Sequence, residues 1–194
     1  MSSFIGHALI GVAMGTAARH SDSRLNIFVI LFFITLSISP DFDYVAEWLF
    51  NIKNTPRYTH SIGYCLVVSL FALAVKRWLF IKTLKNASLA LLLLTPLSHL
   101  VLDFFVGVYK NPILWPLDNS LMTFKYGLLP SAGKISFSNY YFWRNLVIEV
   151  SILIPIVLLV VSSTRTAILS SVTTSLMIAT VLFIGLYFGF TLQR

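Results

Sequence analysis

Long apolar runs separated by short polar connections dominate this chain and constrain its fold more than any other feature. Of its 194 residues, 57% are hydrophobic and only 11% are charged, whereas a soluble domain usually carries about 25% charged residues. A helix needs about 20 residues to cross a bilayer, and about six runs reach or approach that length. Their approximate bounds are 4–18, 25–39, 61–75, 87–106, 145–161 and 167–190. We therefore expect an all-α, polytopic membrane protein with about six transmembrane helices.

The runs predict a single integral membrane domain over residues 1–194, built in three parts. Residues 1–106 form four helices, and the first of them is rich in glycine and alanine, which favours close packing against its neighbours. Residues 107–144 contain prolines, aromatic residues and scattered charges. We expect an interfacial loop with helical pieces there, ending in an aromatic belt at 140–143. Residues 145–194 add two C-terminal helices.

The formal net charge of +7 does not indicate a nucleic-acid-binding protein. Such proteins cluster their basic residues on a soluble surface. Here the lysines and arginines stand at the ends of apolar runs, as membrane topology requires. The single cysteine, Cys65, excludes an intramolecular disulfide and is expected to be a small core residue. The N-terminal residues lack the basic region of a cleaved signal peptide.

One strongly apolar run, 87–106, contains two ionisable residues, His99 and Asp103. Four residues apart on an α-helix, they lie on one face, one turn apart. An imidazole and a carboxylate side by side suit a metal such as zinc. Ionisable groups inside membrane helices are costly and usually functional. We interpret this pair as the centre of a metal site.

If the helices alternate in direction across the membrane, other ionisable residues meet this pair at one membrane face. They come from the starts or ends of four other runs: His7, Asp41, Asp43, His60 and Glu149. His20 and Asp22 fall at the opposite face. Each residue also has a structural interpretation by itself, as an interfacial side chain or as a helix cap. Their convergence favours a metal site over separate structural roles.

Two or three histidines with two or three carboxylates suit zinc best, with manganese and iron as alternatives. A site with two ions can activate a water and stabilise the entering and leaving oxygens of a phosphoryl transfer. Whichever of Asp41 and Asp43 is not a ligand is our candidate general base, and Glu149 is the second choice. Arg57 and Arg144 could each neutralise a phosphate or have an ordinary interfacial role.

Four short motifs, in this order and spacing, resemble the YdjM-type family of bacterial inner-membrane proteins, which are regarded as metal-dependent hydrolases. The motifs are Gly6-His7, Pro40-Asp41-Phe42-Asp43, Thr59-His60-Ser61 and His99-Leu100-Val101-Leu102-Asp103, followed by Gly107 and Pro116. The resemblance covers roughly residues 1–120. The family often has His-Arg-Gly before its Thr-His-Ser motif. This chain has Thr55-Pro56-Arg57 in those places, so only a displaced arginine remains.

The same residues are distantly similar to the zinc phospholipase C and single-strand nuclease superfamily of helical enzymes. That resemblance implies one metal held by four residues: Asp41 or Asp43, His60, His99 and Asp103. It implies a second metal between His7 and Asp103, with Asp103 bridging the two ions. The superfamily has a further His-x-x-x-Asp pair, but no histidine follows His99 in this chain. We therefore expect one or two ions rather than three.

Together these features predict a metal-dependent hydrolase that cleaves a phosphoester of a membrane lipid or lipid-linked substrate. The alternatives are a metal-binding transporter or sensor without hydrolase activity, and a structural membrane protein whose polar residues merely pair. We expect the protein in the bacterial inner membrane. The short connections opposite the site face carry as many basic residues as the much longer loops on the site face. The positive-inside rule therefore places the site outside the cytoplasm.

Overall fold

The regular structure in the parts of the chain that the computed structural model describes is almost entirely helical. These parts are residues 2–19, 23–51, 56–78, 80–124, 129–131, 137–163 and 172–191. Their helices are α1 (Phe4–Ala17), α2 (Ser23–Ile38), the short 3-10 helix η1 (Ser39–Asp41), α3 (Phe42–Phe50), α4 (Ile62–Trp78), α5 (Leu89–Val106), α6 (Tyr140–Ser163) and α7 (Val172–Thr191). Within these ranges, β structure is limited to an isolated antiparallel bridge between Asn111 and Met122. The expected all-α fold is confirmed.

Side-chain caps define where several helices begin. Ser3 Oγ accepts a hydrogen bond from the Gly6 N–H at 2.9 Å at the start of α1. Such caps satisfy backbone N–H groups that have no partner within the helix. Asn139 Oδ1 accepts a hydrogen bond from the Tyr141 N–H at 2.9 Å in the same way. Because of this contact α6 begins at Tyr140 instead of at about residue 145, and the aromatic belt forms its first turn.

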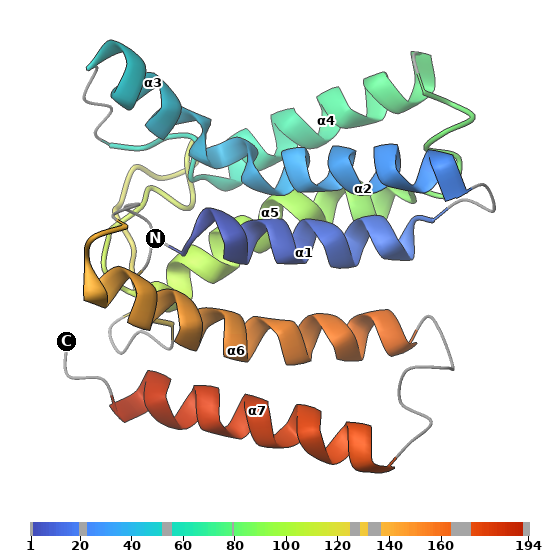
Figure 1. The fold of residues 1–194 in the computed structure, drawn as a ribbon. Helices are drawn as coiled ribbons and strands as arrows, with labels where there is room; N and C mark the ends of the chain where they lie inside the picture. Colours follow the sequence, from blue (N-terminus) through green and yellow to red (C-terminus); the bar gives the residue numbers. More distant parts are fainter. Residues whose placement is uncertain are drawn as a thin grey trace.

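Helices α1, α2, α4 and α5 form one group, with α6 beside α1 and α7 on the outer side of α6 (Figure 1). Glycines bring the backbones of α1 and α2 together. A Cβ atom at Gly11 would lie 2.6 Å from Ile34 Cα, and one at Gly15 would lie 2.7 Å from Ile30 Cα. Only a residue without a side chain fits this approach, so the expected close packing of the small-residue run is confirmed.

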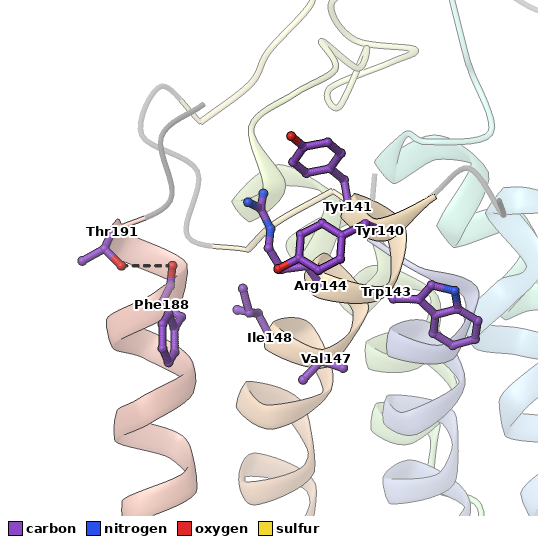
Figure 2. A pocket seen from close by; sticks show the side chains of 8 residues that line it. All are labelled: Tyr140, Tyr141, Trp143, Arg144, Val147, Ile148, Phe188 and Thr191. Atoms are coloured by element: carbon purple, nitrogen blue, oxygen red, sulfur yellow. Dashed lines mark hydrogen bonds between the residues drawn. The ribbon is translucent and has the colours of Figure 1, made fainter. Parts of the chain in front are cut away.

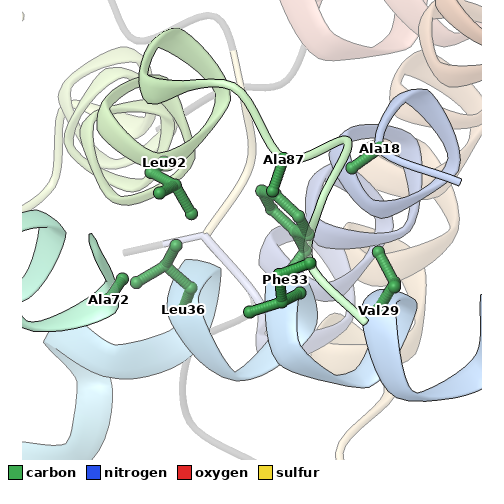
Figure 3. Packing of buried hydrophobic residues seen from close by; sticks show 8 residues of the cluster. Ala18, Val29, Phe33, Leu36, Ala72, Ala87 and Leu92 are labelled. Carbon is green, nitrogen blue, oxygen red and sulfur yellow. The ribbon is translucent and has the colours of Figure 1, made fainter. Parts of the chain in front are cut away.

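Two clusters of buried hydrophobic side chains fix the helices relative to one another. The first joins α2 to α4, α5 and the connections before and after them, and Figure 3 shows most of its members: Ala18, Val29, Phe33, Leu36, Ala72, Leu84, Ala87 and Leu92. The second joins α5 to α6 and includes Leu102, Val106, Ile148, Ile152 and Leu153. Both clusters include residues of α5, so this helix is packed on two sides. Close packing of this kind fixes the positions of its polar side chains.

Four helical stretches in the described residues are long and apolar enough to cross a membrane: Asn26–Glu47, Leu89–Val106, Tyr140–Leu159 and Thr174–Thr191. Helix α1 is apolar but shorter. Large apolar side chains on the outside, such as Phe71 at 70% exposure and Phe183 at 72%, suit contact with lipid tails. A membrane protein is thus supported, while length and composition identify four spans rather than the expected six.

Two further expectations concern the connections. Helix α3 follows η1 directly, although the apolar runs did not predict a separate helix there. In the described parts of 107–139 the chain forms turns and the Asn111–Met122 bridge, without the expected helical pieces. Residues 164–171, which include the expected start of the last helix, lie outside the described residues.

Candidate metal centre

Five buried side chains from separate parts of the chain meet at one end of the helix group. They are His7 of α1, Asp41 of η1, His60 from the turn before α4, and His99 and Asp103 of α5. None of these residues is more than 3% exposed. The first turns of α1 and α4, the end of α2 and the end of α5 all lie at this end of the fold (Figure 1). We call these five residues the candidate metal centre.

Four donor atoms of the centre have the spacing of metal ligands. His60 Nε2 lies 3.2 Å from Asp41 Oδ1 and 3.3 Å from Asp103 Oδ2. His99 Nε2 lies 3.5 Å and 3.7 Å from the same two oxygens. When a metal has bonds of about 2.1 Å, the corners of its coordination tetrahedron are about 3.4 Å apart. These four residues could therefore hold a divalent metal ion.

His7 adds a third imidazole on the other side of the two aspartates. Its Nε2 atom lies 3.5 Å from Asp103 Oδ1 and 3.9 Å from Asp41 Oδ2. Its ring stacks on that of His99, with ring centres 3.6 Å apart and an angle of 13° between the planes. Each aspartate thus turns one oxygen toward His60 and His99 and the other toward His7.

Several polar atoms of this centre are buried without a hydrogen-bond partner among the described residues. They are His7 Nδ1 and Nε2, His99 Nε2, Asp41 Oδ2 and Asp103 Oδ2. Leaving a buried polar group unpaired costs about 1–3 kcal/mol, and more for a charged group. Even with His60 protonated, the two carboxylates leave one uncompensated negative charge in the interior. A bound divalent cation would relieve both costs, so the residues present fit a metal.

A second set of contacts orients the histidine rings. His99 Nδ1 lies 2.9 Å from the Ser37 carbonyl oxygen, an acceptor, so Nδ1 carries the proton and Nε2 is free to bind a metal. Ser37 Oγ in turn donates to the His7 carbonyl oxygen at 2.8 Å. His60 Nδ1 lies 3.1 Å from Thr59 Oγ1. Such contacts hold metal-binding imidazoles in one orientation.

His60 is also sensitive to the two carboxylates that face it. Burial disfavours its charged form, but the nearby carboxylates of Asp103 and Asp41 outweigh this effect and raise the pKa of His60 from 6.5 to about 9. In the metal-free state the ring therefore carries a proton at neutral pH. A metal that binds His60 must displace this proton.

Asp43 lies beside the centre but points its carboxylate elsewhere. Asp43 Oδ2 accepts a hydrogen bond from the Arg57 guanidinium at 3.2 Å, and Glu47 Oε2 accepts a second one at 2.7 Å. The guanidinium also lies over the Tyr44 ring, 3.3 Å from its centre. Asp43 Oδ1 is buried without a partner among the described residues. Of the two aspartates left open as ligands by the sequence, Asp41 is therefore the one placed among the histidines.

Glu149 of α6 binds the N-terminal segment of the chain. Its carboxylate accepts hydrogen bonds from the Ser3 N–H at 3.0 Å and from the Ser2 hydroxyl. The Ser2 N–H donates to Asp103 Oδ1 at 2.7 Å. A Cβ atom at Gly6 would collide with Glu149 Oε1. Glu149 thus reaches the centre indirectly, by holding the segment that contacts Asp103.

The sequence predicted residues that the structure brings together, and it missed the residues that contact them. Ser2 and Ser37 each use one backbone group and one hydroxyl, and contacts of this kind leave no sequence pattern. Glu47 had a usable signal, because it follows Asp43 by one helical turn. His20 and Asp22, expected at the opposite face, lie outside the described residues.

The comparison with protein families identifies the family of the chain. A model of the family described as YdjM inner membrane protein matches residues 1–193. No curated protein and no solved structure matches the chain. The family match extends beyond the motifs at 1–120 to both C-terminal helices. The chain therefore belongs to the YdjM inner membrane protein family.

Proposed function

We propose that this protein is a membrane-embedded, metal-dependent hydrolase that cleaves a phosphoester of a lipid or lipid-linked substrate. The observation that carries the proposal is the set of unpaired, buried donor atoms that face one another across Asp41 and Asp103. Buried polar groups are normally satisfied in folded proteins. Several buried polar groups without hydrogen-bond partners at one place would destabilise the fold unless a ligand binds them, and a metal ion is such a ligand.

Zinc is the ion that the donor types favour. The four histidine-to-aspartate separations of 3.2–3.7 Å are compatible with the edges of a zinc tetrahedron. Histidine nitrogen and carboxylate oxygen are both common zinc ligands. Manganese or iron remains chemically compatible with the same donors.

Two ions fit the arrangement better than one because each aspartate has one oxygen toward His60 and His99 and the other oxygen toward His7. In this proposal, His60 and His99 would hold the first ion, and His7 would hold the second. Asp41 and Asp103 would supply carboxylate oxygens to both. One divalent ion neutralises the two carboxylates, and a second leaves a positive centre that attracts an anionic phosphate. When bound, such ions polarise phosphoryl oxygens and make a nearby water more acidic.

The remaining residues have roles that follow from their contacts. Asp43 keeps one free, buried oxygen and is our candidate general base. Arg57, which is already paired with Asp43 and Glu47, orients that base instead of standing free for a phosphate. Both oxygens of Glu149 lie within hydrogen-bond distance of the Ser3 N–H, so we assign it a positioning role and no longer favour it as a base.

A lipid substrate is supported by where the centre lies. It is formed at the ends of apolar helices, at the end of the fold where α6 begins with its aromatic first turn (Figure 1). Tyrosine and tryptophan side chains of this kind favour the interface between lipid and water. A substrate held in the bilayer presents its phosphate at that depth. A site outside the cytoplasm, as the distribution of basic residues suggests, is part of the same proposal.

The proposal is tested first by metal analysis of the detergent-purified protein. We expect one or two zinc ions per chain, and loss of metal in His99→Ala. Hydrolysis is then measured by mass spectrometry with mixed phospholipids and prenyl phosphates. Asp103→Ala should abolish it, whereas Asp118→Ala should not. Asp118 is a matched control because it is exposed and its carboxylate binds Ser120 in the loop.

Two outcomes would contradict the proposal at different points. Absence of metal from the purified and zinc-supplemented protein would contradict the assignment of these residues as a metal site. Bound metal that depends on His99, without hydrolysis of any lipid phosphate, would instead favour a transporter or sensor. The two measurements thus separate the metal site from the reaction.

A further inference from the structure

Helices α6 and α7 enclose a groove that is separate from the metal centre. Its volume is about 900 Å³. Arg144, Tyr140, Tyr141 and Val147 line it from α6, and Phe188 and Thr191 line it from α7 (Figure 2). Helix α6 contacts α1 on one side and α7 on the other. Glu149 faces α1, so the body of α6 stands between the groove and the centre. We call this space the α6–α7 groove.

The groove has a closed end set by a glycine. A Cβ atom at Gly185 of α7 would collide with Ser151 Oγ and lie 2.9 Å from Ile152 Cγ1, so the two helices are in contact there. Six residues later, Thr191 lies at the open end of the groove. At about 1.5 Å per residue, the groove extends roughly 9 Å along the helices. This depth suits the upper part of an acyl chain lying between two apolar helix faces.

Charge is present only at the open end. Arg144 is half-buried and is the single charged residue in the lining of the groove. Its guanidinium contacts Asn145 Oδ1 at 3.3 Å and lies 5.0 Å from the centre of the Tyr141 ring. No carboxylate pairs with Arg144 among the described residues. Tyr140 and Tyr141 line the same groove and are exposed, so their phenol groups are also available to a ligand.

This combination identifies the class of ligand. An apolar slot whose open end holds one unpaired guanidinium and tyrosine hydroxyls recognises an apolar tail with an anionic head. The open end lies at the aromatic belt, where phospholipid headgroups reside. The lining contains no acidic residue that could offset a choline or ethanolamine cation next to Arg144. An anionic headgroup therefore fits better than a zwitterionic one.

We propose that the α6–α7 groove is a binding site for one anionic membrane phospholipid, with its phosphate on Arg144 and an acyl chain along Val147 and Phe188. The site is independent of the reaction at the metal centre. A lipid held there also fills the gap on the outer face of α6, the helix that positions the N-terminal segment through Glu149.

Native mass spectrometry of the detergent-solubilised protein, titrated with dioleoyl phosphatidylglycerol or dioleoyl phosphatidylcholine, tests the proposal. We expect one phosphatidylglycerol per chain and clearly weaker binding of phosphatidylcholine. Arg144→Gln should weaken phosphatidylglycerol binding by about tenfold or more, because it removes a charge-assisted hydrogen bond. Arg77→Gln, an exposed position at the end of α4, removes the same charge elsewhere and should leave binding unchanged.

A second variant fills the groove without changing any charge. Val147 is 65% exposed, so Val147→Trp places a large ring in the groove without disturbing a buried core. Val67 on α4 is 64% exposed, which makes Val67→Trp a matched control. Loss of binding in Val147→Trp alone supports the site. The proposal is overturned if the groove variants bind like their controls, if both lipids bind equally, or if a second copy of the chain occupies the groove in cross-linking.

Discussion

Replacing Asp103 by asparagine tests the metal centre most directly, because this change keeps the size of the side chain and removes its charge. Asp103 faces all three histidines, at 3.3 Å from His60, 3.5 Å from His7 and 3.7 Å from His99. An asparagine can still accept the hydrogen bond from the Ser2 N–H. The substitution therefore removes a metal ligand while it leaves the neighbouring backbone contact in place.

The expected magnitude follows from the number of ligands. Zinc bound by four protein ligands gains about 10–16 kcal/mol, or roughly 2.5–4 kcal/mol per ligand. Loss of one ligand should weaken zinc binding by a factor of about 10² to 10³. Competition with a fluorescent zinc chelator measures the affinity, and Asp118→Asn is the control for the same chemical change in an exposed loop.

Thermal unfolding adds a second readout. Zinc at 100 times its dissociation constant should stabilise the unaltered protein by about 2.7 kcal/mol. The same zinc concentration should stabilise the Asp103→Asn variant much less, because that variant lacks a metal ligand. The assignment of the centre would be refuted if Asp103→Asn and Asp118→Asn bind zinc equally well. It would also be refuted if a chelator destabilises the unaltered protein and Asp103→Asn by the same amount.

Three further changes have defined outcomes. The raised pKa of His60, from 6.5 to about 9, means that its charged form stabilises the metal-free protein fully below pH 6.5 and that this contribution is lost as the pH rises through 9. Chemical unfolding with chelator across that range should show the decline, and zinc should remove it. Gly6→Ala should displace Glu149 and lower both the melting temperature and the zinc content, because the added Cβ atom would collide with the Glu149 carboxylate. Unchanged values would show that Glu149 can move without loss of stability or metal. Arg57→Gln should reduce hydrolysis through misorientation of Asp43 but preserve zinc content, and a parallel loss of zinc would place Arg57 in the metal site instead.

Much of the candidate site was accessible from the sequence because its ligands interrupt apolar runs. An ionisable residue in a membrane helix is expensive, so His99 and Asp103 stood out against their surroundings. The four-residue spacing placed both on one helix face, and α5 confirms that they lie on the same helix. Alternation of the helices predicted that His7, Asp41 and His60 would reach the same end.

The tertiary structure decided questions that depend on where a particular atom points. Asp41 and Asp43 are two residues apart and were equivalent as candidates, but only Asp41 faces the histidines, because Arg57 holds Asp43. The part played by Glu149 could not be read from spacing, since its partners are the backbone of Ser3 and the hydroxyl of Ser2.

Sequence alone thus predicted the membrane class, the helical architecture and the residue types that gather at the candidate centre. These properties follow from local features of the sequence, namely long hydrophobic runs and the few ionisable residues within or beside them. The tertiary structure decided which aspartate joins the histidines and where the α6–α7 groove lies. Both depend on side-chain directions and helix separations, which arise from long-range packing. The groove depends on the contact at Gly185 and on the side chains that line the space beyond it, and no local pattern in either helix encodes how the two helices pack.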